Sequence, residues 1–94
     1  MKFATFVKYT SDSTAIAAQR PQPRAYLAAL LEQGKLVLAG PFTDNSGAMF
    51  IHEVLDEAEM KMLLAADPFS EGIFVSVECK PWRLVLSSLG GFEA

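Results

Sequence analysis

The sequence predicts a mixed α+β domain in which four antiparallel strands form one sheet and the helices cover one of its faces. The length of 94 residues suits a single small core. Apolar stretches that alternate like strands take turns with stretches of helical period, in the order strand, helix, strand, strand, helix, strand. Gly, Pro, Asp and Ser separate these stretches, as turns require. We expect one domain over residues 1–94, whose C-terminal tail at 82–94 packs on a second copy of the chain.

The first third of the chain predicts one strand and one main helix. Residues 2–10 are apolar or β-favouring, and the polar run at 11–14 ends this strand. A short helical turn at 15–19 precedes a proline-rich stretch. Proline is unsuited to a helix interior but suits a helix start, so the main helix is expected to begin near Pro23. Gly34 stands where a left-handed cap would end it.

The rest of the chain predicts a hairpin, a second helix and a last strand. Asp56 and Glu59 have the spacing of an N-cap and its reciprocal acid, placed directly before an apolar helical run. Pro81 is expected to stop the last strand. In chain order these elements are a strand at 35–42, a turn at 44–47, a strand at 48–54, a helix ending at Asp67 and a strand at 73–79.

Right-handed crossovers fold this order into the ferredoxin-like arrangement, which leaves the second sheet face without helices. The last strand is expected to point Ile73, Val75, Val77 and Cys79 to one side, and Phe74, Ser76 and Glu78 to the other. The first strand similarly sets Phe3, Val7 and Tyr9 against Phe6 and Lys8. A composition that is 51% hydrophobic exceeds what so short a chain buries alone. We therefore expect a homodimer formed through the open sheet face, with room for a small ligand.

Charge and composition argue against several other classes of protein. A net charge of -3 offers no basic stripe for a phosphate backbone, so no nucleic-acid partner is expected. No apolar run reaches the length of about 18 residues that a membrane span needs, and the first residues alternate unlike a signal peptide. We expect a cytoplasmic protein without a membrane partner. The chain has one cysteine, Cys79, and one histidine, so no metal site is expected and Cys79 is interpreted as a structural thiol.

The candidate site centres on Asp67, an acid at a helix C-terminus, where partial negative charge repels it. The predicted topology brings the end of the first strand, the start of the main helix and the turn after the second strand to this rim. Asp67 is therefore expected near Tyr9, Arg24 and Phe42, with Phe42 and Phe69 burying it in part. It is interpreted either as a proton-transferring group or as a structural residue that opens a turn or pairs with Arg24.

Three further residues are candidates for ligand binding, and each also has a structural interpretation. Arg24 can clamp a carboxylate or neutralise Asp67, but a guanidinium is no base at ordinary pH. Tyr9 can donate a hydrogen bond at the rim, or pack only. His52 lies in a strand several residues from the rim, where a structural role is favoured over a ligand contact. The expected ligand is a small polar or anionic molecule.

The ordered set of motifs along nearly the whole chain resembles the YCII-related family. These motifs are Arg20-Pro21, Tyr26-Leu27 with Leu30, Gly34-Lys35-Leu36, Ala39-Gly40-Pro41, Gly47, Asp67-Pro68-Phe69, Gly72 and Pro81-Trp82. The resemblance implies a dimeric α/β barrel, in which two ferredoxin-like subunits join their open sheet faces. It also implies a small-molecule enzyme whose site pairs the Asp of the Asp-Pro motif, here Asp67, with a His at the start of the main helix.

The chain departs from that family pattern at one position. Pro23 stands where the family has its His, and a proline side chain can neither donate nor accept a proton. Two functions stay open. The first is an enzyme of lyase, isomerase or dehydrochlorinase type that uses Asp67 and needs neither metal nor organic cofactor. The alternative is a noncatalytic small-ligand-binding or accessory homodimer, in which an ion pair with Arg24 would lower the pKa of Asp67, whereas burial in an active site would raise it.

Overall fold

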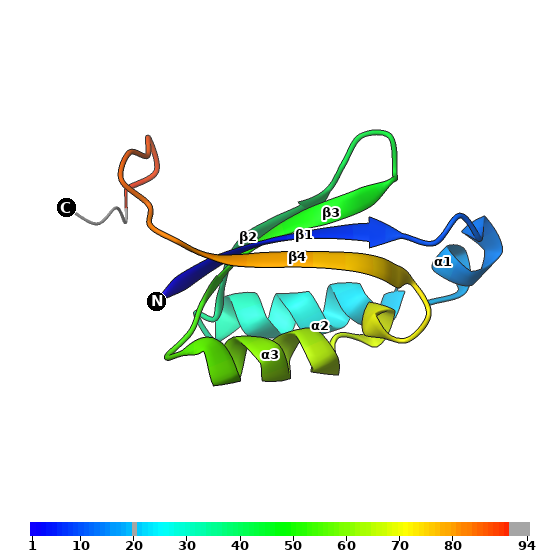
Figure 1. Cartoon of the computed structure of the whole chain (residues 1–94), viewed down its shortest axis with the longest axis horizontal. Coiled ribbons are helices and arrows are strands. Elements are labelled where there is room, and N and C mark those ends of the chain that lie inside the picture. The colour runs from blue at the N-terminus through cyan, green and yellow to red at the C-terminus, as the bar shows by residue number, and fades with distance from the viewer. Residues whose placement is uncertain (20, 91–94) are drawn as a thin grey trace.

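The computed structural model describes residues 1–19 and 21–90, and it shows a twisted sheet with α2 and α3 packed on one face (Figure 1). The strands follow the order β2-β3-β1-β4 and all neighbours are antiparallel, which confirms the predicted ferredoxin-like topology. The elements are β1 (Lys2–Tyr9), α1 (Ser13–Gln19), α2 (Pro21–Glu32), β2 (Leu36–Pro41), β3 (Gly47–Glu53), α3 (Glu57–Ala66), the 3-10 helix η1 (Pro68–Ser70) and β4 (Phe74–Trp82).

The ends of the two main helices follow local chemistry. α2 begins at Pro21, earlier than the expected Pro23, because the first turn of a helix has no intrahelical partner for its N–H groups and tolerates proline. α3 begins after Asp56, whose Oδ1 accepts a hydrogen bond of 2.9 Å from the Glu59 amide, as predicted. α3 ends at Ala66, so Asp67 is the first residue beyond the helix.

β4 differs from its prediction in two ways. It does not stop at Pro81 but continues to Trp82. β4 is an edge strand, and an edge strand tolerates proline because the backbone N–H groups on its outer side have no neighbouring strand to bond. Its register against β1 shifts between Lys8 and Tyr9, so that Tyr9 faces Phe74. This bulge turns Phe74 toward the helices, where it packs against the core, and the predicted opposite orientation is wrong.

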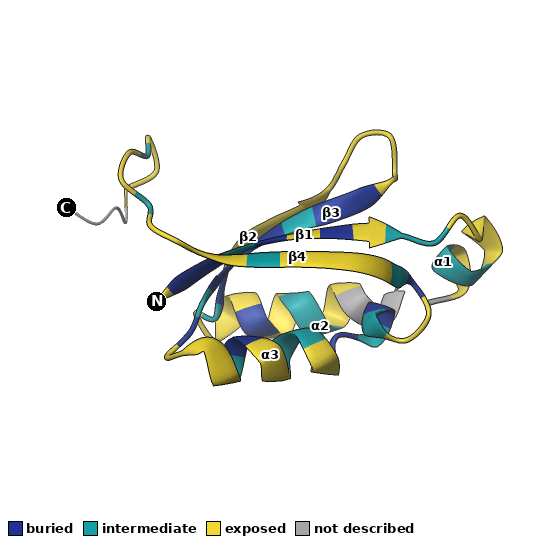
Figure 2. Cartoon of the chain, in the orientation of Figure 1, coloured by how far each residue is buried: buried dark blue, intermediate teal, exposed yellow. Residues whose placement is uncertain are grey.

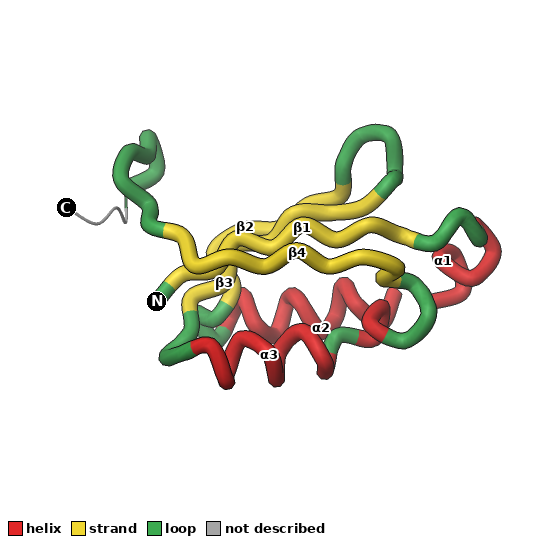
Figure 3. Tube along the Cα trace, viewed as in Figure 1, coloured by secondary structure: helices red, strands yellow, loops and turns green. Residues whose placement is uncertain are grey.

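The core lies between the sheet and the two helices, as the comparison of burial with secondary structure shows (Figures 2 and 3). Two clusters of buried apolar residues form this core. One joins α2 to β1, β2 and β3, and the other joins α3 to β1 and to the segment that follows β3. Thr5 is fully buried between them and donates a hydrogen bond of 3.3 Å to the sulfur of Cys79. The first cluster contains Val7, Leu30, Leu36, Ala48 and Phe50, and the second contains Phe3, Val54 and Met60.

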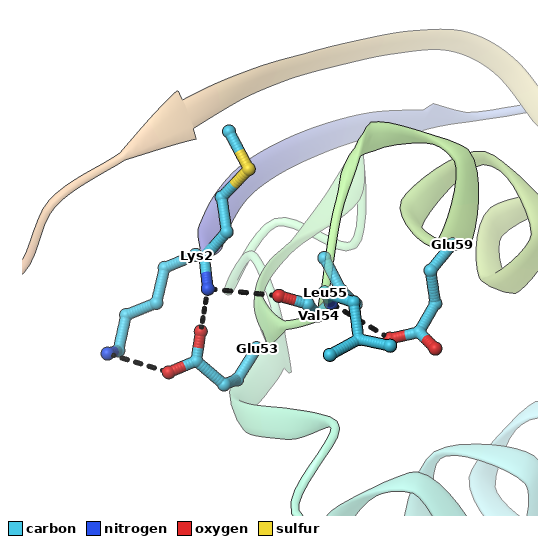
Figure 4. A network of polar contacts seen from close by, with 6 residues as sticks. Lys2, Glu53, Val54, Leu55 and Glu59 are labelled. Carbon is cyan, nitrogen blue, oxygen red and sulfur yellow. Dashed lines mark hydrogen bonds and ion pairs between the residues drawn. The ribbon is translucent and has the colours of Figure 1, made fainter.

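A polar network joins β1, β3 and α3 near the start of β1 (Figure 4). The α-amino group of Met1 lies 2.8 Å from one carboxylate oxygen of Glu53 and donates a hydrogen bond of 2.9 Å to the Val54 carbonyl. Lys2 reaches the other oxygen of Glu53 at 3.2 Å. These contacts, led by the hydrogen bond from the Met1 amine, lower the pKa of Glu53. The network therefore links the N-terminus of the chain to the segment that leads into α3.

The opposite face of the sheet carries apolar side chains without a helix over them. Phe6 stacks on Phe42 with parallel rings and a centroid distance of 6.4 Å, and both side chains are exposed by more than a third. The register places Met49 beside Phe6, and Trp82 lies at the far corner, 41% exposed. No helix in the described ranges 1–19 and 21–90 is long and apolar enough to span a bilayer.

Candidate functional site

An open cavity of about 500 Å3 lies on the helix side of the sheet, between α2, β2 and the turn that follows α3. Most of its wall is apolar, and its polar side chains among the described residues come from Tyr9, Arg24, Asn45 and Asp67. Cavities of this size bury much of a drug-sized molecule. The apolar part of the wall is formed by Leu27, Ala28, Leu31, Leu36, Leu38, Ala39, Gly40, Pro41, Ala48, Phe50, Phe69 and Phe74.

Asp67 is held in the cavity wall by the turn that it opens. Its Oδ1 accepts a hydrogen bond of 2.9 Å from the Phe69 amide, and its carbonyl accepts one from Ser70. The residue is 5% exposed. Burial raises the pKa of the Asp67 carboxyl above its usual range, and the hydrogen bond from Phe69 offsets this only in part. Such a carboxyl keeps a proton more readily than an exposed Asp does.

Tyr26 belongs to α2 and lies near Asp67, although it does not line the cavity. Its hydroxyl donates a hydrogen bond of 2.6 Å to the carbonyl of Leu63 and so ties α2 to the last turns of α3. Burial raises the pKa of the Tyr26 phenol, and the nearby charge of Asp67 raises it further. This contact fixes the distance between the helix that borders the cavity and the turn that carries its carboxyl.

Arg24 and Tyr9 also line the cavity, as their predicted position at this rim requires. Arg24 is exposed, and the described residues show no ion pair between its guanidinium and Asp67. The structural interpretation of Asp67 as the partner of Arg24 therefore has no support. The Tyr9 ring is parallel to that of Phe74, with their centroids 6.2 Å apart, and it meets the Phe69 ring edge-on at a centroid distance of 5.5 Å.

Phe42 does not bury Asp67, and this expectation is wrong. The residue follows β2 and stacks on Phe6 at the open sheet face, whereas the cavity lies on the helix face. Phe69 is buried and lines the cavity as expected. Arg20, which carries part of the family motif, lies outside the described residues.

His52 does not line the cavity. It is 2% exposed on the helix side of β3, and its ring lies 5.9 Å from that of Phe50. Its Nδ1 is buried without a hydrogen-bond partner among the described residues. Burial lowers the pKa of His52 to about 4, so the imidazole is neutral at pH 7. In the described part of the chain, no three His, Cys, Asp or Glu side chains come together as metal ligands.

The buried neutral His52 predicts a loss of stability in mild acid. Since its pKa is about 4 in the folded chain and near 6.5 when exposed, the unfolded state binds the proton first as the pH falls. Its contribution to the free energy of unfolding is present above pH 6.5 and falls by about 3 kcal/mol between pH 6.5 and pH 4. Urea unfolding at a series of pH values measures this.

The control for this prediction is His52→Leu, which removes the titrating group and the unpartnered Nδ1 together. Asp67 acts with the opposite sign, because its raised pKa lets the folded state bind a proton before the unfolded state does. The difference between the wild-type and His52→Leu curves cancels that contribution. A difference that stays constant from pH 7 to pH 4 would contradict the assignment of His52 as a buried neutral group.

Sequence reasoning missed two residues at this site. Asn45 was interpreted only as part of a turn, although the predicted topology brings that turn to the rim of Asp67. Tyr26 was interpreted only as part of an apolar helix face, and no pattern in the sequence indicates that its hydroxyl reaches Leu63. The first could have been found from topology, and the second depends on the packing of α2 against α3.

The comparisons with known proteins agree with this architecture. The chain matches the YCII-related domain over residues 1–83. It is similar in structure to 5-chloro-2-hydroxyhydroquinone dehydrochlorinase (TftG) from Burkholderia phenoliruptrix AC1100, solved with 2,5-dihydroxybenzoquinone, with a TM-score of 0.79 and 24% identity over 89% of this chain and 95% of that one. It is also similar to PA3566 from Pseudomonas aeruginosa, with a TM-score of 0.59 and 14% identity over 89% and 93% of the two chains. No curated protein matches the chain. The protein belongs to the YCII-related family and has a ferredoxin-like fold.

Proposed function

We propose that this protein is a small-molecule enzyme in which Asp67 transfers a proton to or from a ligand bound in the cavity. The observation that supports this most strongly is a buried carboxyl in a cavity wall, with a raised pKa and without a cation paired to it among the described residues. Buried carboxyls of raised pKa are common among general acids and bases. A solvated Asp has a pKa near 4 and is a weak base at neutral pH.

The cavity wall favours a flat ligand with an oxygen group. The rings of Tyr9, Phe69 and Phe74 pack together on one side, and Phe50 continues this aromatic wall. The exposed guanidinium of Arg24 suits an anionic oxygen of the ligand, such as a carboxylate or an ionised hydroxyl. Tyr9, whose ring belongs to this aromatic wall, is proposed as a second residue that contacts the ligand. His52 is left out of the proposed site because it does not line the cavity.

The reaction class is a proton transfer with elimination or isomerisation. The structurally similar TftG is a dehydrochlorinase and was solved with 2,5-dihydroxybenzoquinone. Loss of HCl needs a group that accepts the proton while chloride leaves, and Asp67 is proposed for that role here. Neither a metal ion nor an organic cofactor takes part in such a step, since the carboxylate and the ligand exchange the proton directly.

A noncatalytic ligand-binding role is the second candidate, and one observation favours it. Asp67 accepts the Phe69 amide as the N-cap of η1, so a turn-forming role already accounts for an acid at this position. Pro23, which stands where related sequences are expected to have a His, further lowers the rate that we expect. Activity is therefore proposed to be slow.

The experiment that tests the proposal uses the substrate and the ligand named for the similar structure. Wild-type protein is incubated with 5-chloro-2-hydroxyhydroquinone, and chloride release is followed with an ion-selective electrode against a protein-free control. Binding of 2,5-dihydroxybenzoquinone is measured by calorimetry. Chloride release above the control supports the enzyme, and binding without release supports the noncatalytic candidate.

The open sheet face is proposed as a homodimer interface. It presents the exposed Phe6 and Phe42 stack and the half-exposed Trp82, and apolar patches of this kind mark protein interfaces. The apolar side chains of the tail at 83–90, above all Leu86 and Leu89, are exposed and have room to pack on the second copy. A stable interface of this sort buries on the order of 1,200 Å2 or more.

Light scattering is expected to give twice the subunit mass of 10.2 kDa at micromolar concentration. Phe6→Lys places a charge on the proposed interface and is expected to shift the particle to the single-subunit mass, because an unpaired buried charge costs several kcal/mol. Met62→Lys makes the same kind of change on the outer side of α3 and should leave the mass doubled. A wild-type particle of single mass would contradict the dimer.

A further inference from the structure

The cavity has polar wall residues on elements other than the turn that carries Asp67. Its volume of about 500 Å3 exceeds what one small ring fills, since pockets from about 300 Å3 upward hold drug-sized molecules. Asn45 lines the cavity and is the only uncharged amide side chain among the described lining residues. It comes from the β2–β3 hairpin, which rises away from the helix layer that carries Asp67 (Figure 1).

The backbone at Asn45 is held in a special conformation. Its φ is 61°, and it is the only described non-glycine residue with a positive φ. The turn is well fixed: the Asn45 amide donates to the Phe42 carbonyl at 2.9 Å, and the Ser46 amide donates to Asp44 at 2.9 Å. The Tyr9 amide donates to the Ser46 carbonyl at 2.8 Å, which ties the hairpin to β1. Asn45 is therefore presented to the cavity by a rigid support.

The turn itself does not need the carboxamide. Glycine reaches positive φ without a steric cost, and asparagine is one of the few residues with a side chain that tolerates it. The hydrogen bonds that hold the turn use the backbone N–H of Asn45 and the side chain of Asp44, and none of them uses the Asn45 carboxamide. The carboxamide is thus available to a ligand, while the geometry of position 45 is set without it.

We propose that Asn45 is a ligand-binding residue that hydrogen-bonds an uncharged oxygen, a carbonyl or a hydroxyl, on the part of the ligand that faces the β2–β3 hairpin. This inference rests on the proposed function, because it assumes that the cavity is the ligand site. A carboxamide offers donors and an acceptor without charge, whereas Arg24 favours an anion. The ligand class that fits these residues carries an acidic oxygen for Arg24 and a neutral oxygen for Asn45, the latter on a second ring or side group.

The test compares two probes, 2,5-dihydroxybenzoquinone and a hydroxynaphthoquinone, which adds a second ring. Dissociation constants are measured by NMR titration, in which the side-chain amide signals of Asn45 are assigned by their loss in Asn45→Gly. This variant keeps the positive φ and removes the carboxamide, so the fold is retained. It is expected to weaken the tighter-binding probe about fivefold, as the loss of one neutral hydrogen bond does.

Two further variants sharpen the test. Thr43→Ala changes a polar residue of the same loop that does not line the cavity, and it should alter the affinity by less than about twofold. Asn45→Asp keeps the size and tolerates the same φ, but its charge repels an ionised hydroxyquinone, so it should weaken binding more than Asn45→Gly does.

Equal affinities of wild type and Asn45→Gly for both probes would overturn the role of Asn45. So would the absence of any shift in its side-chain amide signals with either probe at millimolar concentration. The proposed function fails separately: if binding depends on Asn45 but chloride release does not depend on Asp67, the ligand contact stands and the catalytic role falls. Thermal unfolding of each variant confirms that the changes in affinity are not changes in folding.

Discussion

Asp67→Asn is expected to lower turnover by a factor of about 10²–10⁴, the range that a positioned general acid or base contributes. Asparagine has nearly the same shape, and its Oδ1 can still accept the Phe69 amide that holds the turn. The substitution therefore removes the titrating group while keeping the local fold. Affinity for 2,5-dihydroxybenzoquinone should change by less than about threefold, because the loss lies in the proton transfer and not in ground-state binding.

Asp44→Asn is the matched control for this prediction. Asp44 makes the same type of contact, accepting a backbone amide two residues on, but it is exposed, does not line the cavity and has a lowered pKa. Its replacement should leave turnover unchanged. Arg24→Gln should do the reverse of Asp67→Asn, weakening affinity for the anionic probe more than it lowers the turnover number. If Asp67→Asn turns over substrate at the wild-type rate, Asp67 is a turn former only.

The parts of the fold that depend on local chemistry could be predicted from the sequence. Asp56 and Glu59 predicted the start of α3, because capping involves residues a few positions apart. The order of elements predicted the topology, since handedness rules leave few arrangements. That topology in turn placed Tyr9 and Arg24 near Asp67, because it determines which element ends share a rim.

The parts that depend on long-range register could not be predicted. Strict alternation placed Phe74 on the wrong face, because the bulge opposite Tyr9 arises from the pairing of β1 with β4 and leaves no local pattern. Phe42 was assigned to the cavity from its position after β2, but its ring stacks on Phe6 instead. The raised pKa of Asp67 could be posed only as one of two outcomes, since it depends on whether Arg24 reaches the carboxyl.

Gly47→Ala is expected to lower the free energy of unfolding by about 3 kcal/mol or more, the upper range for forced overpacking. A Cβ at position 47 would lie 1.9 Å from the carbonyl oxygen of Val7 and 3.0 Å from its carbonyl carbon. These are backbone atoms of the neighbouring strand, so no side-chain rotation relieves the clash. β1 and β3 would have to separate at the pair formed by Lys8 and Gly47.

The effect should extend to the cavity, because the same end of the sheet carries two of its polar residues. The Tyr9 amide bonds to Ser46 and the Phe42 amide bonds to Gly47, both at 2.8 Å, so a displaced Gly47 moves the supports of Tyr9 and Asn45 together.

Gly40→Ala is the control in the neighbouring strand: no atom lies within 4 Å of its added Cβ, and its φ is not positive. That variant should be stabilised by about 0.4–1 kcal/mol, because alanine restricts the unfolded chain. Urea unfolding midpoints that are equal for the two variants would contradict the close approach of β1 and β3 at Gly47.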